Sequence, residues 1–195
     1  MSLIVFMETE KGLLLAGDSR ISIDKDPFWH KDTAYKILDF YGKYGIAFVG
    51  DGEIEGELMH TVVCDFISMS DSTLSIEEFS NNLKNFISFM GHPKTCFYIL
   101  GYEDGKRKIF IIDMINNIYE DISSTICGCN GEDDIAWDLL SNNYEQHKLF
   151  DDAIKYIPEI FNKTSETILS VGGEIDILLI KKSGSVEWIK RKNLT

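Results

Sequence analysis

The sequence contains little proline, no internal repeat and no long apolar run. Its 195 residues include only 3 prolines, which stand far apart at Pro27, Pro93 and Pro158. A chain of this length without linker-like composition is expected to form one domain over residues 1–195. No apolar run reaches the ~18 residues that a membrane-spanning helix needs. We therefore expect no membrane partner.

Basic residues are also scarce. The chain has 19 Lys and Arg against 32 Asp and Glu, which gives a formal net charge of −13. Binding to a phosphate backbone needs a surplus of basic side chains, so this charge argues against a nucleic-acid partner. The one basic cluster, Lys190-Arg191-Lys192, is short and stands near the C-terminus, where we expect it to be solvated.

Cysteines are few and do not form a metal-binding pattern. The sequence has no basic start followed by an apolar segment, as a signal peptide would, so we expect a cytoplasmic protein with reduced thiols. The pair Cys127-Gly128-Cys129 has no Cys or His partner at zinc-finger spacing. We expect no metal site, and the sequence implies no cofactor. The four cysteines are Cys64, Cys96, Cys127 and Cys129.

Strand-like segments come in pairs that are joined by short turns. Apolar, β-branched runs flank turns that contain Gly, a pattern typical of antiparallel hairpins. Because the runs are apolar nearly throughout, we expect strands covered on both faces. The predicted pairs are 2–7 with 13–18, 35–40 with 44–49, 95–101 with 108–113, and 174–180 with 186–190, and a further short strand is expected over 124–128.

Helices are predicted between the strand pairs. Apolar residues recur at three- and four-residue steps over 52–68 and 75–89, and the second segment opens with a capping box, Ser75-Ile76-Glu77-Glu78. Two more helices are expected over 132–140 and 151–161. The order of strands and helix pairs predicts an α+β fold, a four-layer αββα sandwich of two antiparallel sheets flanked by helices.

The second residue carries a hydroxyl at the start of a predicted strand. After removal of Met1, which a small second residue permits, Ser2 would carry its own α-amine. That amine has an ordinary pKa near ~8 and can accept the hydroxyl proton. Such a residue is a nucleophile for amide hydrolysis that needs no histidine.

Three further residues stand at strand ends. Asp18 ends the second predicted strand, beside the start of the first if the hairpin pairs in simple register. Lys36 follows, and an ammonium near the nucleophile lowers the pKa values of the amine and the hydroxyl. Gly50 forms a corner before a helix, where its N–H could stabilise an oxyanion. A purely structural ion pair is the alternative interpretation of Asp18 and Lys36.

These motifs together resemble the proteasome β-subunit family, which includes the bacterial HslV peptidase. The resemblance rests on the hydroxyl start and on Leu13-Leu14-Leu15-Ala16-Gly17-Asp18-Ser19-Arg20, Tyr35-Lys36-Ile37 and Ala47-Phe48-Val49-Gly50-Asp51-Gly52. It implies an N-terminal nucleophile hydrolase of the αββα fold. The family's catalytic Thr, Asp, Lys and oxyanion Gly fall on Ser2, Asp18, Lys36 and Gly50. A peptide-binding backbone position falls on Ser22, and the wall of the specificity pocket falls near Gly52.

The second half of the chain resembles the family more loosely. The turn at 127–131 places the family's supporting serine on Cys129, and a thiol is a poor replacement for that hydroxyl. The family's late aspartate falls on Ile168 and its late serine on Val171. An isoleucine cannot replace a carboxylate. The resemblance therefore implies a site whose inner residues are kept and whose surrounding residues are changed.

Three functional hypotheses follow. The first is a proteasome-like peptidase subunit in which Ser2 hydrolyses peptides or unfolded proteins. The resemblance then implies a homo-oligomeric ring and a possible ATPase partner. The second is a catalytically inactive, proteasome-like scaffold, which a retained Met1 would also produce because it acylates the Ser2 nitrogen. The third is a hydrolase of small amides.

Overall fold

Two antiparallel sheets form the centre of the molecule. The computed structural model describes residues 2–23, 26–131 and 134–192, with residues 22, 23 and 26–29 described by their backbone alone. The first sheet has the strand order β12 (Cys127–Gly131), β1 (Leu3–Glu8), β2 (Gly12–Asp18), β13 (Ile175–Lys181) and β14 (Val186–Lys190). The second has the order β11 (Ile118–Asp121), β10 (Lys106–Asp113), β9 (Thr95–Glu103), β6 (Tyr44–Gly50) and β5 (Ile37–Phe40).

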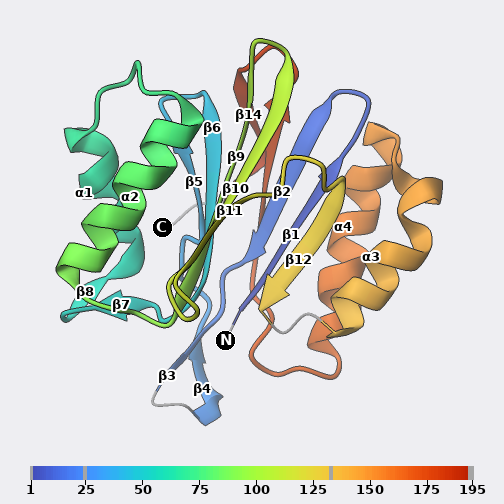
Figure 1. Ribbon diagram of the computed structural model, residues 1–195. Coiled ribbons are helices and arrows are strands. Elements are labelled where there is room, and N and C mark those ends of the chain that lie inside the picture. The colour runs from blue at the N-terminus through green and yellow to red at the C-terminus, as the bar shows by residue number, and fades with distance from the viewer. Residues whose placement is uncertain (1, 24–25, 132–133, 193–195) are drawn as a thin grey trace.

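Helices cover the outer face of each sheet (Figure 1). The second sheet is covered by α1 (Met59–Met69) and α2 (Ile76–Met90), and the first by α3 (Asp134–His147) and α4 (Phe150–Ser165). This arrangement is the predicted four-layer αββα sandwich. The prediction of a single domain over residues 1–195 stays a prediction.

Strand β1 shows why the apolar runs are nearly continuous. Its side chains alternate between two buried clusters, since successive residues of a strand face opposite ways. Ile4 and Phe6 lie between the sheets, and Leu3, Val5 and Met7 lie under α3 and α4. A strand in a central layer is thus apolar on both faces.

The register of the first hairpin positions the candidate site. In the antiparallel pairing of β1 with β2, Ile4 lies opposite Gly17 and Val5 opposite Ala16. The end of β2 therefore lies beside the start of β1, as the simple register predicts.

The helix predicted over 52–68 is wrong at its start. Two short strands, β7 (Glu53–Ile54) and β8 (Glu57–Leu58), come first, and α1 begins at Met59. Their two-residue turn has positive φ at both positions, 51° at Glu55 and 85° at Gly56. Positive φ at both central residues is the geometry of tight hairpin turns and is incompatible with a right-handed helix.

Other predicted bounds also shift. The strand expected over 124–128 is β12 at Cys127–Gly131, because its pairing with β1 sets its limits. The helix expected over 132–140 runs on to His147, while Glu132 and Asp133 lie outside the described residues, and the last helix runs on to Ser165.

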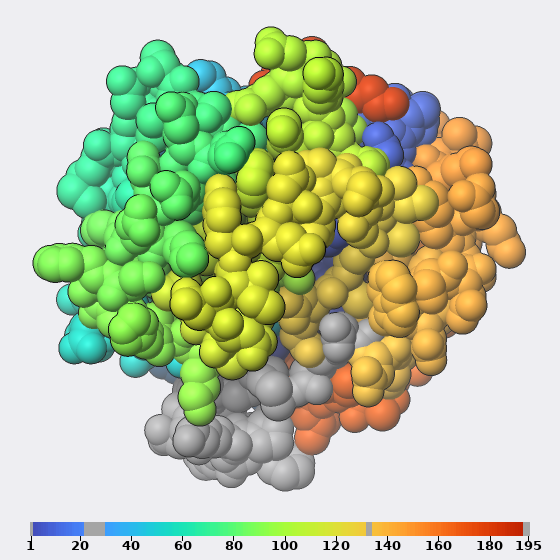
Figure 2. All heavy atoms as spheres, in the orientation of Figure 1, coloured from blue at the N-terminus to red at the C-terminus, as the bar shows by residue number. Residues whose placement is uncertain are grey.

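Sequence patterns missed the short hairpin strands and one edge strand. The strands β3 (Ile21–Ile23) and β4 (Asp26–Lys31) pair with each other outside the two main sheets. Strand β11 is half-polar and lies at a sheet edge, so it lacks the apolar run that marks a central strand. Figure 2 shows the yellow segment that contains β11 lying across one face of the molecule between the two helical layers.

The basic cluster near the C-terminus is not uniformly solvated. Lys190 and Arg191 are exposed, but Lys192 is only 4% exposed. The expectation of a solvated cluster is therefore wrong for Lys192. Among the described residues, the structure contains no helix that is long and apolar enough to span a membrane.

Candidate active site

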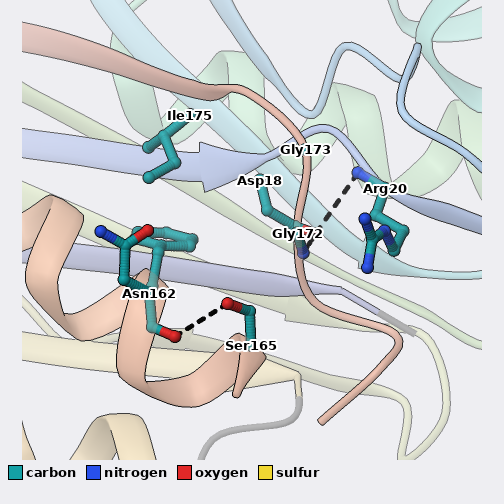
Figure 3. A pocket seen from close by; sticks show the side chains of 8 residues that line it. Asp18, Arg20, Asn162, Ser165, Gly172, Gly173 and Ile175 are labelled. Atoms are coloured by element: carbon teal, nitrogen blue, oxygen red, sulfur yellow. Dashed lines mark hydrogen bonds between the residues drawn. The ribbon is translucent and has the colours of Figure 1, made fainter.

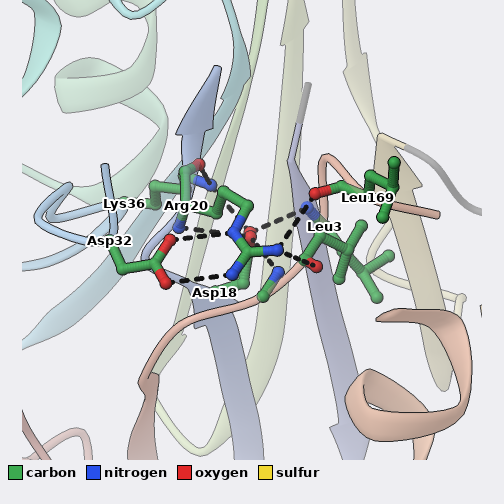
Figure 4. Close-up of polar contacts among 8 residues, drawn as sticks. Leu3, Asp18, Arg20, Asp32, Lys36 and Leu169 are labelled. Atoms are coloured by element: carbon green, nitrogen blue, oxygen red, sulfur yellow. Dashed lines mark hydrogen bonds and ion pairs between the residues drawn. The ribbon is translucent and has the colours of Figure 1, made fainter. Parts of the chain in front are cut away.

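Asp18 is the centre of a buried polar network between the start of β1 and the end of β2 (Figure 4). Its Oδ1 accepts hydrogen bonds from the Leu3 N–H at 2.9 Å and from Lys36 Nζ at 2.7 Å. Its Oδ2 accepts from the N–H groups of Arg20 at 3.3 Å and Gly172 at 3.1 Å. The Asp18 side chain is fully buried. The structure thus brings Asp18 and Lys36 together beside the first strand, as the sequence predicts.

Lys36 is held by two acceptors in a nearly water-free position. Its Nζ also donates to the Arg20 carbonyl at 2.5 Å, and its side chain is only 5% exposed. Burial lowers the pKa of Lys36, because a charged group loses solvation there, and the Asp18 carboxylate opposes that effect. Lys36 can therefore release its proton more readily than an exposed lysine.

Ser2 lies buried immediately before β1. Its neighbour Leu3 is the residue whose amide is bound by Asp18. The Ser2 carbonyl lies against Gly131 of β12 so closely that a Cβ on Gly131 would stand 1.7 Å from its oxygen. Only glycine fits there, and the φ of Gly131 is also positive, at 111°. Met1 lies outside the described residues.

Gly131 therefore sets the position of Ser2, a role that no sequence pattern indicated. The available signal was a glycine just before a predicted helix. That signal is weak, because turn glycines are common and the partner strand lies far away in sequence.

Gly50 closes β6 in a conformation that requires glycine. Its φ is 123°, and a Cβ would stand 2.0 Å from the Lys94 carbonyl oxygen. The Phe48 N–H donates to the Lys36 carbonyl at 3.2 Å, and the Asp51 N–H donates to the Lys94 carbonyl at 3.0 Å. Because N–H directions alternate along a strand, the Gly50 N–H lies on the same edge as that of Phe48. This edge is the one that faces the Lys36 segment.

Cys129 lies away from the start of β1. It stands opposite Val5, while Gly131 stands opposite Leu3. Cys129 is half-buried and packs against the core cluster under α3 and α4. By register, Gly131 is therefore the β12 residue beside Ser2, and Cys129 lies two residues further along the strand.

The two predicted substrate-binding residues lie on adjacent segments. Ser22 belongs to β3 and stands opposite His30 of β4. Gly52 is half-buried, and a Cβ on it would lie 3.8 Å from the Cγ2 atom of Ile21, the first residue of β3. The backbone of β3 and the corner after Gly50 therefore lie side by side.

The loop that follows α4 contains the two departures from the family pattern. Val171 is fully buried and Ile168 packs against the same core cluster, so both act as apolar core residues. The Arg20 guanidinium holds this loop, because Nη1 donates to the carbonyls of Leu169 at 3.0 Å and Val171 at 3.4 Å.

Asp32 orients that guanidinium. Arg20 donates from Nε to Oδ1 at 2.8 Å and from Nη2 to Oδ2 at 3.0 Å, a bidentate arrangement. The hydrogen bond from Arg20 holds the pKa of Asp32 below its usual value. Neither residue was assigned a role from the sequence, because the partners of Arg20 in the late loop lie about 150 positions away.

A small cavity of about 180 Å³ reaches Asp18 from the side of α4 (Figure 3). Its lining includes Asp18, Arg20 and Gly172 together with Asn162 and Ser165 of α4. The volume has room for a few water molecules. Among the residues that the structure describes, no three His, Cys, Asp or Glu side chains gather as a metal site would require.

Comparison with known proteins supports a proteasome-like fold. No protein-family model matches the chain. The chain is 22% identical over 186 residues to proteasome subunit beta 2 of Pyrococcus furiosus. The match covers 92% of this chain and 86% of that protein. A solved structure of an Anbu (Gly-1) mutant from Hyphomicrobium sp. strain MC1 matches with a TM-score of 0.73 at 18% identity, over 96% of this chain and 85% of that one. The chain therefore shares the αββα fold of that structure, a proteasome-like fold.

Proposed function

We propose that this chain is a proteasome-like peptidase subunit whose nucleophile is Ser2 after removal of Met1. The observation that carries the proposal is the buried ion pair between Lys36 Nζ and Asp18 Oδ1 at 2.7 Å. The amide of Leu3, the residue after Ser2, binds the same carboxylate oxygen. The pair therefore fixes an ammonium beside the position from which Ser2 would react.

The proposed reaction is acyl transfer followed by hydrolysis. The Ser2 Oγ attacks the substrate carbonyl while the α-amine of Ser2, directly or through a water, takes the hydroxyl proton. The Lys36 ammonium, held by Asp18, lowers the pKa of that amine and hydroxyl. The amine then returns the proton to the leaving nitrogen, and a water hydrolyses the ester.

Gly50 supplies the oxyanion donor in this proposal. Its N–H lies on the edge of β6 that faces the Lys36 segment, and its φ keeps the chain turned there. One such donor contributes about 10²–10³ in rate. An extended peptide would run between the backbone of β3 at Ser22 and the corner at Gly52. This arrangement favours peptides or unfolded proteins as substrates.

We also propose that the active form is a homo-oligomeric ring, which an ATPase partner could feed. The proteasome-like fold supports the ring, and the outer helices α1 and α2 are the proposed contact elements. Sedimentation velocity of the purified chain tests the assembly separately from catalysis, and a monomer at all concentrations contradicts it.

The test of the nucleophile is intact mass spectrometry before and after treatment with a β-lactone or epoxyketone probe. We expect protein from its own host to lack Met1 and to gain one probe mass on Ser2. Ser2→Ala permits the same Met1 removal and should gain none, while Ser70→Ala, at the end of α1, should label normally. Retention of Met1 in the native protein would falsify the proposal.

A catalytically inactive scaffold is the second candidate function. The observation that favours it is that Val171 is buried in the apolar core and half-buried Ile168 packs against it, at positions where the family has polar residues. Absence of probe labelling on a chain that lacks Met1 supports this candidate. Labelling with turnover of small acyl-amides, and not of fluorogenic peptides, assigns the site to small-amide hydrolysis instead.

A further inference from the structure

Lys192 is a buried cation near the end of the described chain. It follows the exposed residues Lys190 and Arg191, yet its own exposure is 4%. A lysine this deeply buried requires partners that compensate the lost solvation. These partners are Ala34, Tyr35 and Asp176.

Two contacts hold the Lys192 ammonium against the segment that leads into Lys36. Its Nζ donates a hydrogen bond to the Ala34 carbonyl. The same Nζ lies 4.6 Å from the centroid of the Tyr35 ring, within cation–π range. Lys192 thus contacts the two residues that directly precede Lys36.

Asp176 anchors the other end of Lys192. Its Oδ1 accepts a hydrogen bond from the Lys192 N–H at 2.7 Å, and Asp176 is itself 2% exposed. Asp176 lies on β13 of the first sheet, opposite Gly17 of β2. Burial raises the pKa of Asp176 and lowers that of Lys192, and the opposite charge of each partner counters the effect.

The segment before Lys36 is therefore held from two sides. The Ala34 N–H donates to the Ser19 carbonyl at 2.9 Å, beside Asp18, while the Ala34 carbonyl accepts from Lys192. Lys36 directly precedes β5, the strand at one edge of the second sheet. Lys192 thus ties the edge of that sheet to β13 of the first sheet.

A buried cation held in this way contributes little net stability, because desolvation offsets the attraction of its partners. What it does supply is a defined geometry for the backbone that it contacts. We propose that Lys192 is a positioning residue for Lys36: it fixes the backbone of Ala34 and Tyr35 and thereby holds Lys36 Nζ on Asp18. The proposal rests on the proposed hydrolase function only for its effect on turnover.

The test compares Lys192→Met with the matched control Lys190→Met, two residues earlier and exposed. Kinetics with a fluorogenic peptide should show that Lys192→Met lowers kcat by roughly 10-fold to 100-fold, the range for a small misplacement of a reacting group, with KM little changed. Lys190→Met should change neither constant. Lys192→Arg keeps the charge and a donor, and should recover most of kcat.

A second measurement needs no turnover. NMR of protein with isotope-labelled lysines follows the Lys36 Nζ signal, which Lys36→Arg identifies. Lys192→Met should raise the pKa of Lys36, because a nearby positive charge is removed and Lys36 becomes better solvated. Lys190→Met should leave the titration as in the wild type. If Lys192→Met folds poorly, Lys192→Gln removes the same charge but keeps a polar side chain, and it should move the Lys36 titration in the same direction.

The outcomes separate the two proposals. An unchanged Lys36 signal and titration in both Lys192→Met and Lys192→Gln overturns the positioning role and leaves the hydrolase intact. A changed Lys36 titration in a protein that hydrolyses nothing supports the positioning role and overturns the hydrolase. An equal loss of kcat in Lys190→Met overturns the specific role of Lys192.

Discussion

At the scale of single residues, Asp18 is the acceptor on which the candidate site depends. Its two oxygens bind donors from the chain start, the lysine segment, its own turn and the late loop: Leu3, Lys36, Arg20 and Gly172. Because Asp18 is fully buried, each donor that it loses would be left unsatisfied away from water.

Removing either charge of the Asp18–Lys36 pair is expected to be costly. Asp18→Ala leaves the Lys36 ammonium buried without a counter-charge, which should lower the free energy of unfolding by about 3–5 kcal/mol. The double variant Asp18→Ala/Lys36→Met removes both charges and should lose less than the sum of the two single variants. Urea unfolding of the three variants measures this coupling, and strictly additive losses would contradict it.

Hairpin register predicted the position of Asp18 beside the start of β1. Lys36 leads into β5 of the other sheet, so the packing of the two sheets brings its Nζ to Asp18. The catalytic roles of both residues stay predictions. Sequence patterns missed Gly131 and Asp32, whose importance comes from contacts with the Ser2 carbonyl and the Arg20 guanidinium. Cys129 was assigned from a local motif, whereas the β1–β12 register sets it opposite Val5.

At the scale of elements, the central hairpins were predictable and the connection from β6 to α1 was not. A strand buried on both faces has a continuous apolar run, so it is recognised even when its first or last residue is misplaced. The β7–β8 turn depends instead on two positive φ angles, which the periodicity of apolar residues does not encode. The start of α1 was therefore placed too early.

The end of β6 offers an element-level test with a built-in control. Gly50 and Gly56 both have positive φ, but a Cβ on Gly50 would stand 2.0 Å from the Lys94 oxygen, whereas nothing lies within 4 Å of one on Gly56. Gly56→Ala should cost about 1 kcal/mol, from backbone strain alone. Gly50→Ala should cost clearly more and should also abolish probe labelling of Ser2. Thermal unfolding and labelling measure both, and equal destabilisation would contradict the clash.

At the scale of the whole molecule, the site is assembled from segments far apart in sequence. The Arg20 guanidinium joins the end of β2 to the late loop, and that loop returns the Gly172 N–H to Asp18. The first and last thirds of the chain therefore meet at one carboxylate.

This long-range link should depend on pH through Asp32. The pKa of Asp32 is depressed in the folded state, so its contribution to stability is present above the ordinary value of 3.8 and is lost as the pH falls through the folded-state pKa. The stability difference between wild type and Asp32→Asn should be constant well above pH 3.8 and should shrink below it. Denaturant unfolding at a series of pH values measures this difference.

Arg20→Met supplies the control for that titration. Without the guanidinium, the pKa of Asp32 returns toward its ordinary value, so Arg20→Met and Arg20→Met/Asp32→Asn should lose stability in parallel as the pH falls. If the difference in stability between these two variants still changes with pH, the effect comes from another partner of Asp32.

The sequence alone determined the layers and the central hairpins. These features depend on apolar patterning and on contacts across short hairpins, both of which are local. Tertiary structure alone decided that Gly131 packs on Ser2, that Arg20 holds the late loop and that Lys192 is buried beside the Lys36 segment. Those contacts join residues more than 100 positions apart, and their geometry exists only once both sheets have packed against each other.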